Sequence, residues 1–125
     1  MLELARSLAK RTVAHTTDLT AIIEATATAY APGGSLAIAF RTEWLGTTNN
    51  KTAQLALAWA REQVRLALAE ILARARGERV LRAAGDTDTL AWLWLAACEA
   101  LAQEPASAVP DRVHALVSFL TEGAS

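Results

Sequence analysis

The sequence contains few of the residues that interrupt helices. Its 125 residues include 6 glycines and 3 prolines, and β-branched residues scarcely cluster outside Ala21–Glu24. Alanine and leucine, which favour helices, are prominent among the 53% of residues that are hydrophobic. This composition argues against a fold built on strands and predicts an all-α protein.

Cysteine is almost absent. Cys98 is the only one, which excludes an internal disulfide and a cysteine-rich zinc site. A single thiol fits a reducing compartment, so we expect a cytoplasmic protein. Because Cys98 ends an apolar run with no cation close by in the sequence, we interpret it as a buried structural thiol rather than a nucleophile.

Long apolar runs and a surplus of one charge are also missing. The 12 basic and 13 acidic residues give a formal net charge of −1 without forming a stripe, which argues against direct nucleic-acid binding by this chain. Charges interrupt the leucines of Met1–Arg11, so we predict no signal peptide. The longest strictly apolar run, Leu90–Cys98, is about half of the ~20 residues that span a bilayer, and we expect no membrane partner.

The hydrophobic spacing predicts about six helices joined by short loops. The first runs from the N-terminus to about His15. The second is capped by Asp18 and ends before Pro32-Gly33-Gly34, because proline and paired glycines break the helical hydrogen-bond ladder. A short apolar helix follows, capped by Ser35 and closed by Gly46, and its apolar residues are Leu36, Ile38, Phe40, Trp44 and Leu45.

The second half of the chain continues this pattern, and residues 1–125 are predicted to form one domain, a helical bundle. The remaining elements are a helix from Asn49 or Asn50 to about Arg76, a short helical turn at Glu78–Ala84, a helix over Thr89–Gln103 capped by Asp86 or Asp88, and a last helix from near Ala108 with Pro110 in its first turn.

Two of these helices carry more apolar surface than one neighbour can cover. The longest has one stripe formed by Leu57, Ala60, Val64, Leu68, Ile71 and Ala75, and a second formed by Leu55, Trp59, Leu66 and Ala73. Two stripes predict two neighbours. Every side chain of Leu90–Cys98 is apolar, so that helix must be covered on all sides, and so small a chain has few helices to do this.

The order of the helices and their apolar texture resemble the C-terminal regulatory half of TetR-family transcriptional regulators. The resemblance covers nearly the whole chain and rests on the segments Leu72–Asp88, Leu90–Leu101 and Asp111–Leu120. It implies that the last two helices of each subunit form a four-helix dimer interface, and that the preceding helices enclose a pocket for a small, usually apolar effector. Nothing before Thr17 resembles the family's helix-turn-helix domain, so operator binding is not carried over.

The candidate effector-binding residues are aromatic and polar side chains set among leucines. The alternative is ordinary core packing, which is the commoner role of an aromatic residue at helical spacing. The candidates are Thr26, Tyr30, Phe40, Trp44, Trp59 and Gln63.

The candidate dimer interface consists of apolar residues in the last two helices, because so much contiguous apolar surface would make a monomer prone to aggregate. Some of these residues must instead fill the core of the single chain, and which tryptophan points outward stays open. The candidates are Trp92, Leu93, Trp94, Ala97, Leu101, Val113, Leu116, Val117 and Leu120.

We find no catalytic constellation and predict no cofactor, no metal and no enzyme activity. His15 and His114 each lack a second ligand at metal-binding spacing; we interpret His15 as capping the end of the first helix and place His114 at an interface edge. Our first hypothesis is a non-enzymatic homodimer that senses a small apolar effector. The alternative is a free-standing helical dimerisation or protein-interaction module; an enzyme would need polar groups converging in a cleft.

Overall fold

In the computed structural model, residues 1–37 and 51–123 are described, and every regular element in them is a helix. The predicted all-α fold is therefore confirmed for this part of the chain. The predicted helix through Phe40 and Trp44 lies outside the described residues. The elements are α1 (Leu2–Ala9), α2 (Thr16–Tyr30), α4 (Lys51–Gly77), α5 (Thr87–Leu101), the short 3-10 helix η2 (Ala106–Ala108) and α6 (Val109–Glu122).

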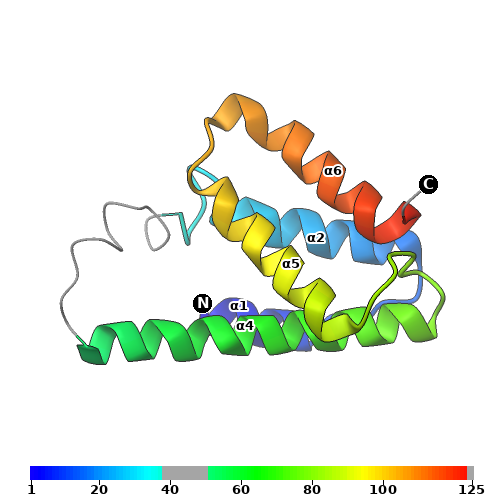
Figure 1. Cartoon of the computed structure of the whole chain (residues 1–125), viewed down its shortest axis with the longest axis horizontal. Coiled ribbons are helices and arrows are strands. Elements are labelled where there is room, and N and C mark those ends of the chain that lie inside the picture. The colour runs from blue at the N-terminus through cyan, green and yellow to red at the C-terminus, as the bar shows by residue number, and fades with distance from the viewer. Residues whose placement is uncertain (38–50, 124–125) are drawn as a thin grey trace.

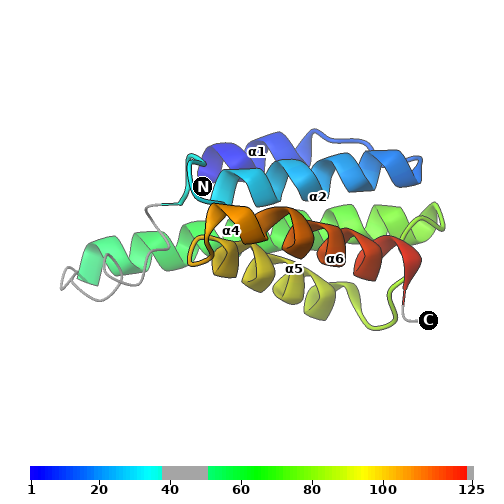
Figure 2. The same ribbon diagram turned by 90° about the horizontal axis from the view of Figure 1, so that it is seen from above.

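The long helix α4 is the base on which the others assemble. It packs most extensively on α5 and α1, while α2 packs on α6 and α5 (Figure 1). Viewed from above, α1 and α2 lie on one side of α4 and α5 lies on the other (Figure 2). Helix α5 therefore has neighbours in α4, α2 and α6, which explains much of its apolar composition.

The core lies where α2, α4 and α5 meet. Trp94 is its largest fully buried side chain and Tyr30 the next. The remaining large buried apolar side chains come from these helices and from the end of α6, and they are Leu19, Ile22, Ile23, Val64, Leu68, Ile71, Leu72, Leu90 and Leu120.

The start of α2 differs from the prediction. Helix α1 ends at Ala9 rather than near His15, and Val13 is buried in the connection. His15 is extended and precedes α2, so it does not cap α1. The Asp18 carboxylate lies in the first turn of α2 and accepts hydrogen bonds from the backbone N–H groups of Ala14 at 3.0 Å and His15 at 2.9 Å. These bonds lower the pKa of Asp18.

The end of α2 is a tight turn, as the paired glycines predicted. The Gly34 N–H donates to the Ala31 carbonyl, and the Leu36 N–H donates to the Ala29 carbonyl, so the chain folds back over the last turn. A Cβ at Gly34 would lie 2.1 Å from the Thr28 carbonyl oxygen. Only glycine allows this approach.

The segment after α4 is not helical, contrary to the expected turn at Glu78–Ala84. Arg79 has a φ of 61°, which reverses the chain, and the N–H groups of Val80 and Leu81 then both reach the Ala75 carbonyl. Val80 and Leu81 are buried by this reversal. A continued helix would have carried these apolar side chains away from the core.

The same segment holds the end of α6. The Arg82 N–H donates to the Leu120 carbonyl at 2.9 Å. Gly123, with a φ of 75°, lies against Arg82, whose carbonyl oxygen would be 2.9 Å from an added Cβ. We call this contact the Arg82–Leu120 clasp. It fastens the C-terminal end of α6 to the loop that follows α4.

Helices α5 and α6 begin as predicted. Asp86 is the cap of α5, and its side chain accepts from the Thr89 N–H at 2.8 Å, which lowers the pKa of the carboxyl group. Pro110 lies in the first turn of α6, where its missing N–H would have no helical partner. No helix in the described residues is long and apolar enough to cross a membrane.

The N-terminal turns of α4 extend beyond the packed helices (Figure 1). From Lys51 to Glu62 nearly every residue is exposed, whereas Val64 and the residues one and two turns later are buried. The first apolar stripe is therefore covered by other helices only in the C-terminal half of α4. The second stripe stays largely in solvent, with Leu55 71% and Trp59 57% exposed.

Candidate functional site

A groove with almost wholly apolar walls runs between α5 and α6. We call it the α5–α6 groove; its volume is about 410 Å³. Two large apolar side chains on its walls, Leu93 and Phe119, are each 40% exposed. The full set of lining residues is Leu93, Ala97, Ala100, Leu101, Glu104, Arg112, Ala115, Leu116 and Phe119.

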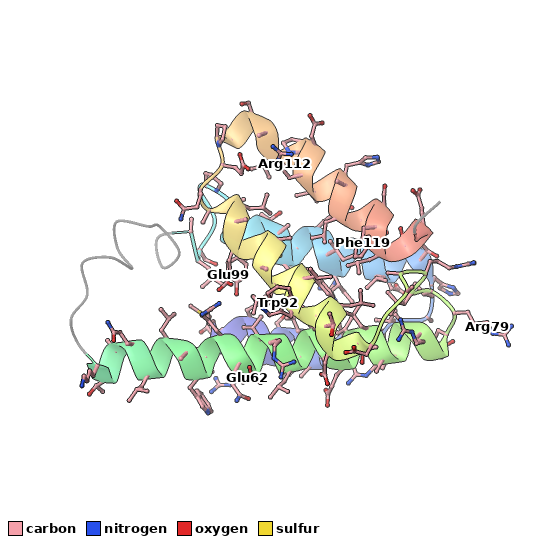
Figure 3. All side chains as sticks on the ribbon, in the orientation of Figure 1. Glu62, Arg79, Trp92, Glu99, Arg112 and Phe119 are labelled. Carbon is pink, nitrogen blue, oxygen red and sulfur yellow. The ribbon has the colours of Figure 1, made fainter. Side chains whose placement is uncertain are left out.

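Small residues make the surface around this groove shallow. Ala96 and Ala100 of α5 and Ala115 of α6 are exposed, and Ala97 is half-buried. Alanines at such positions allow another helix to approach closely. Trp92 of α5 is 59% exposed, and Figure 3 shows it together with Phe119 and Arg112 on these helices.

The only charged residues in the groove are Glu104 and Arg112. Their closest nitrogen and oxygen atoms are 3.6 Å apart, and the Arg112 side chain is 64% exposed. A pair so exposed contributes little to stability. It can, however, orient a partner at the edge of an apolar contact.

The predicted interface residues divide into two groups. Trp94, Leu101 and Leu120 are buried within the single chain, so the inward-pointing tryptophan is Trp94 and the outward-pointing one is Trp92. The others are exposed or half-buried: Trp92, Leu93, Ala97, Val113, Leu116 and Val117. Of the whole predicted set, Leu93, Ala97, Leu101 and Leu116 line the α5–α6 groove.

Phe119 is the residue that the sequence reasoning missed. It lies between Val117 and Leu120, which were assigned to one apolar face, and it was left out of that face. Its spacing of three from Leu116 and four from Ala115 is the signal that could have identified it, because both neighbours share its side of α6.

The predicted effector-binding residues do not line one cavity. Thr26 and Tyr30 are fully buried in the core, and the Thr26 hydroxyl donates to the Ile22 carbonyl at 2.7 Å. Burial raises the pKa of Tyr30, so its phenol is neutral. Trp59 and Gln63 instead line an open groove between α1 and α4, to which neither Thr26 nor Tyr30 contributes. Phe40 and Trp44 lie outside the described residues.

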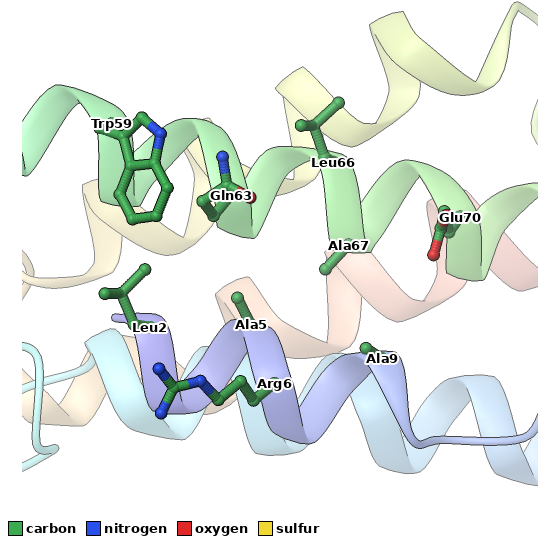
Figure 4. Close-up of a pocket in the computed structure, with 9 residues that line it drawn as sticks. All are labelled: Leu2, Ala5, Arg6, Ala9, Trp59, Gln63, Leu66, Ala67 and Glu70. Atoms are coloured by element: carbon green, nitrogen blue, oxygen red, sulfur yellow. The ribbon is translucent and has the colours of Figure 1, made fainter.

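The groove between α1 and α4, which we call the α1–α4 groove, has a volume of about 430 Å³ (Figure 4). Trp59 on α4 and Leu2 on α1 point toward one another across it. The lining residues are Leu2, Ala5, Arg6, Ala9, Trp59, Gln63, Leu66, Ala67 and Glu70.

A two-point ion pair ties α4 to α5. Arg61 donates to both carboxylate oxygens of Glu99, at 2.6 and 2.8 Å. The Glu99 side chain is 16% exposed and that of Arg61 46%. The hydrogen bond from the carboxylate raises the pKa of Arg61, which stays charged. The pair fixes the crossing of α5 over α4 beside the core.

The remaining candidate chemical groups are isolated from one another. Cys98 is fully buried, and burial raises its pKa to about 12, which agrees with the predicted structural thiol. His15 and His114 are both exposed; His15 precedes α2 and His114 lies on α6. In residues 1–37 and 51–123 no three metal-binding side chains gather at one place.

Comparison of the chain with protein-family models, with curated proteins and with solved structures found no match.

Proposed function

We propose that this chain is a non-enzymatic, homodimeric regulatory domain in which α5 and α6 of two copies form a four-helix interface. The observation that supports this best is the α5–α6 groove, where exposed large apolar side chains stand beside exposed alanines. The resemblance to the C-terminal halves of TetR-family regulators implies the same pair of helices. The cytoplasm, with its reducing conditions, is the compartment that suits the buried Cys98 thiol.

Leaving this apolar surface in water costs free energy. Leu93, Phe119 and Trp92 are 40%, 40% and 59% exposed, and they lie on adjoining helices. Apolar surface gains about 25 cal/mol per Å² when it leaves water. A second copy supplies a matching surface, because a two-fold interface brings one patch against itself.

The packed surroundings of Thr26 and Tyr30 favour an interaction module over a sensor with an internal effector site at these two residues. We therefore place dimerisation first. Binding of a small molecule is a separate proposal, which rests on the α1–α4 groove.

The test measures, by sedimentation equilibrium, the oligomeric state of two matched variants in which an exposed alanine is replaced by arginine. Ala100 lines the α5–α6 groove and is exposed, so Ala100→Arg places a bulky charge in the interface without disturbing the core. Ala73, an exposed alanine of α4, provides the control Ala73→Arg. The wild type and the control are expected to be dimers, and Ala100→Arg a monomer. A monomeric wild type, or a dimeric Ala100→Arg, contradicts the proposal.

A further inference from the structure

The α1–α4 groove has the size and the walls of a small-molecule site. Its volume of about 430 Å³ falls in the usual range for such sites, about 300–1,000 Å³. Three large apolar side chains form the walls, with Leu2 37%, Trp59 57% and Leu66 43% exposed. The alanines Ala5, Ala9 and Ala67 also line the groove.

The two charged residues of this groove differ in whether they already have an ionic partner. Glu70 lies at one end, and its carboxylate is 3.6 Å from the Arg74 guanidinium. Arg6 lies on α1 beside Leu2 and forms no ion pair within residues 1–37 and 51–123. Gln63 adds an amide to the lining of the groove. The groove therefore offers a cation without a partner next to an apolar wall.

We propose that the α1–α4 groove binds an acyl carboxylate, with the chain lying along the apolar wall and the carboxylate on Arg6. A guanidinium presents two parallel N–H donors that match the two oxygens of a carboxylate. Trp59 and Leu2 point toward one another at the end of the groove where Arg6 lies (Figure 4), so they would cover the part of the acyl chain nearest to the carboxylate. From Leu2 to Ala9 the groove follows α1 for about 10 Å, at 1.5 Å per residue, which suits a chain of medium length.

The charge distribution selects the ligand class. A cationic amphiphile would face the cationic Arg6 toward one end and an already paired Glu70 at the other. A neutral alcohol of the same length would gain the apolar contacts, but the guanidinium would donate to one uncharged oxygen, which is weaker than two parallel bonds between opposite charges. This site lies on the opposite side of α4 from α5, so the inference does not depend on dimerisation through the α5–α6 groove.

The first experiment titrates the full chain with decanoate, decanol and decylamine, each below its aggregation limit, and follows binding by calorimetry. Decanoate is expected to bind saturably and about tenfold or more tighter than the other two, which is the effect of hydrogen bonds to a charged group. Equal affinity for all three probes, or no saturable binding of decanoate, overturns the proposal.

The second experiment locates the site with variants whose folding is checked by thermal unfolding. Arg6→Gln is expected to weaken decanoate about tenfold and leave decanol unchanged, while Trp59→Ala weakens both. Arg112→Gln is the control, because Arg112 is the arginine of the other apolar groove. Loss of decanoate affinity in Arg112→Gln instead of Arg6→Gln overturns the proposal, as does a change of oligomeric state in Trp59→Ala, which would make a second copy the occupant.

Discussion

Replacing Phe119 with serine tests the proposed dimer quantitatively. A phenylalanine side chain buries about 150–250 Å² when it is fully covered. Because Phe119 is 40% exposed in the single chain, about 60–100 Å² of it remains for a partner to cover. At about 25 cal/mol per Å² this amounts to about 2 kcal/mol for each copy.

A two-fold interface contains Phe119 twice, so Phe119→Ser is expected to weaken dimerisation by up to about 4 kcal/mol. That corresponds to a dimer dissociation constant raised by up to about a thousandfold. The conversion is an upper value, because association also orders side chains at the interface.

Sedimentation equilibrium over a wide concentration range measures this constant, and far-ultraviolet circular dichroism verifies that the variant stays helical. Trp59→Ser is the matched control, because Trp59 is 57% exposed but lies in the α1–α4 groove. The reasoning fails if Phe119→Ser leaves the dissociation constant unchanged, or if Trp59→Ser raises it equally.

Three further predictions concern stability. Gly34→Ala should lower the free energy of unfolding by about 2 kcal/mol, because its Cβ would lie 2.1 Å from a carbonyl oxygen. Gly77→Ala is the control and should be neutral or slightly stabilising, because a Cβ at Gly77 has no neighbour within 4 Å. Urea denaturation of both variants measures the difference. A double-mutant cycle that replaces the side chains of Arg61 and Glu99 by alanine, singly and together, should give a coupling free energy of about 1 kcal/mol that becomes smaller in high salt. A coupling free energy of zero would contradict the two-point geometry. The pKa of the Cys98 thiol rises from 9.0 in the unfolded chain to about 12 in the folded one, so its contribution to the free energy of unfolding is complete below pH 9 and is lost as the pH rises toward 12. The free energy of unfolding of Cys98→Ala should therefore fall less steeply than that of the wild type at alkaline pH. Identical slopes would exclude this cause.

Much of the fold follows from local signals in the sequence. The stop after Tyr30 and the end of the long helix close to Gly77 were predicted, and Asp86 was one of the two predicted caps of α5, because each of these signals depends on residues within one turn. The buried residues of the first α4 stripe, from Val64 to Ala75, also follow from periodicity.

The errors arose where a tertiary contact overrides local propensity. The apolar spacing of the first helix continues to Val13, but α1 ends at Ala9 and Val13 is buried in the connection that follows. Val80 and Leu81 likewise enter the core through the reversed conformation of Arg79, which no helical pattern signals. Local propensity is a weak prior in such cases.

The candidate sites were only partly predictable for the same reason. Periodicity indicates that Trp92, Trp94 and Phe119 lie on helices, but it does not say which face of each helix a neighbour covers. Trp94 is at the centre of the core, and Trp92, two residues earlier, is in solvent. The α1–α4 groove combines Arg6 and Trp59 from distant parts of the sequence, so only the packing of two helices brings them together.

The Arg82–Leu120 clasp has a consequence for how the molecule opens. One backbone hydrogen bond closes the chain from Arg82 to Leu120 into a loop, and that loop contains the whole of α5 and nearly all of α6. Proteins open locally in roughly contiguous cooperative units that often coincide with supersecondary motifs such as this pair of helices. The amide hydrogens of α5 and α6 should then exchange with solvent together, while those of the exposed first turns of α4 exchange much earlier.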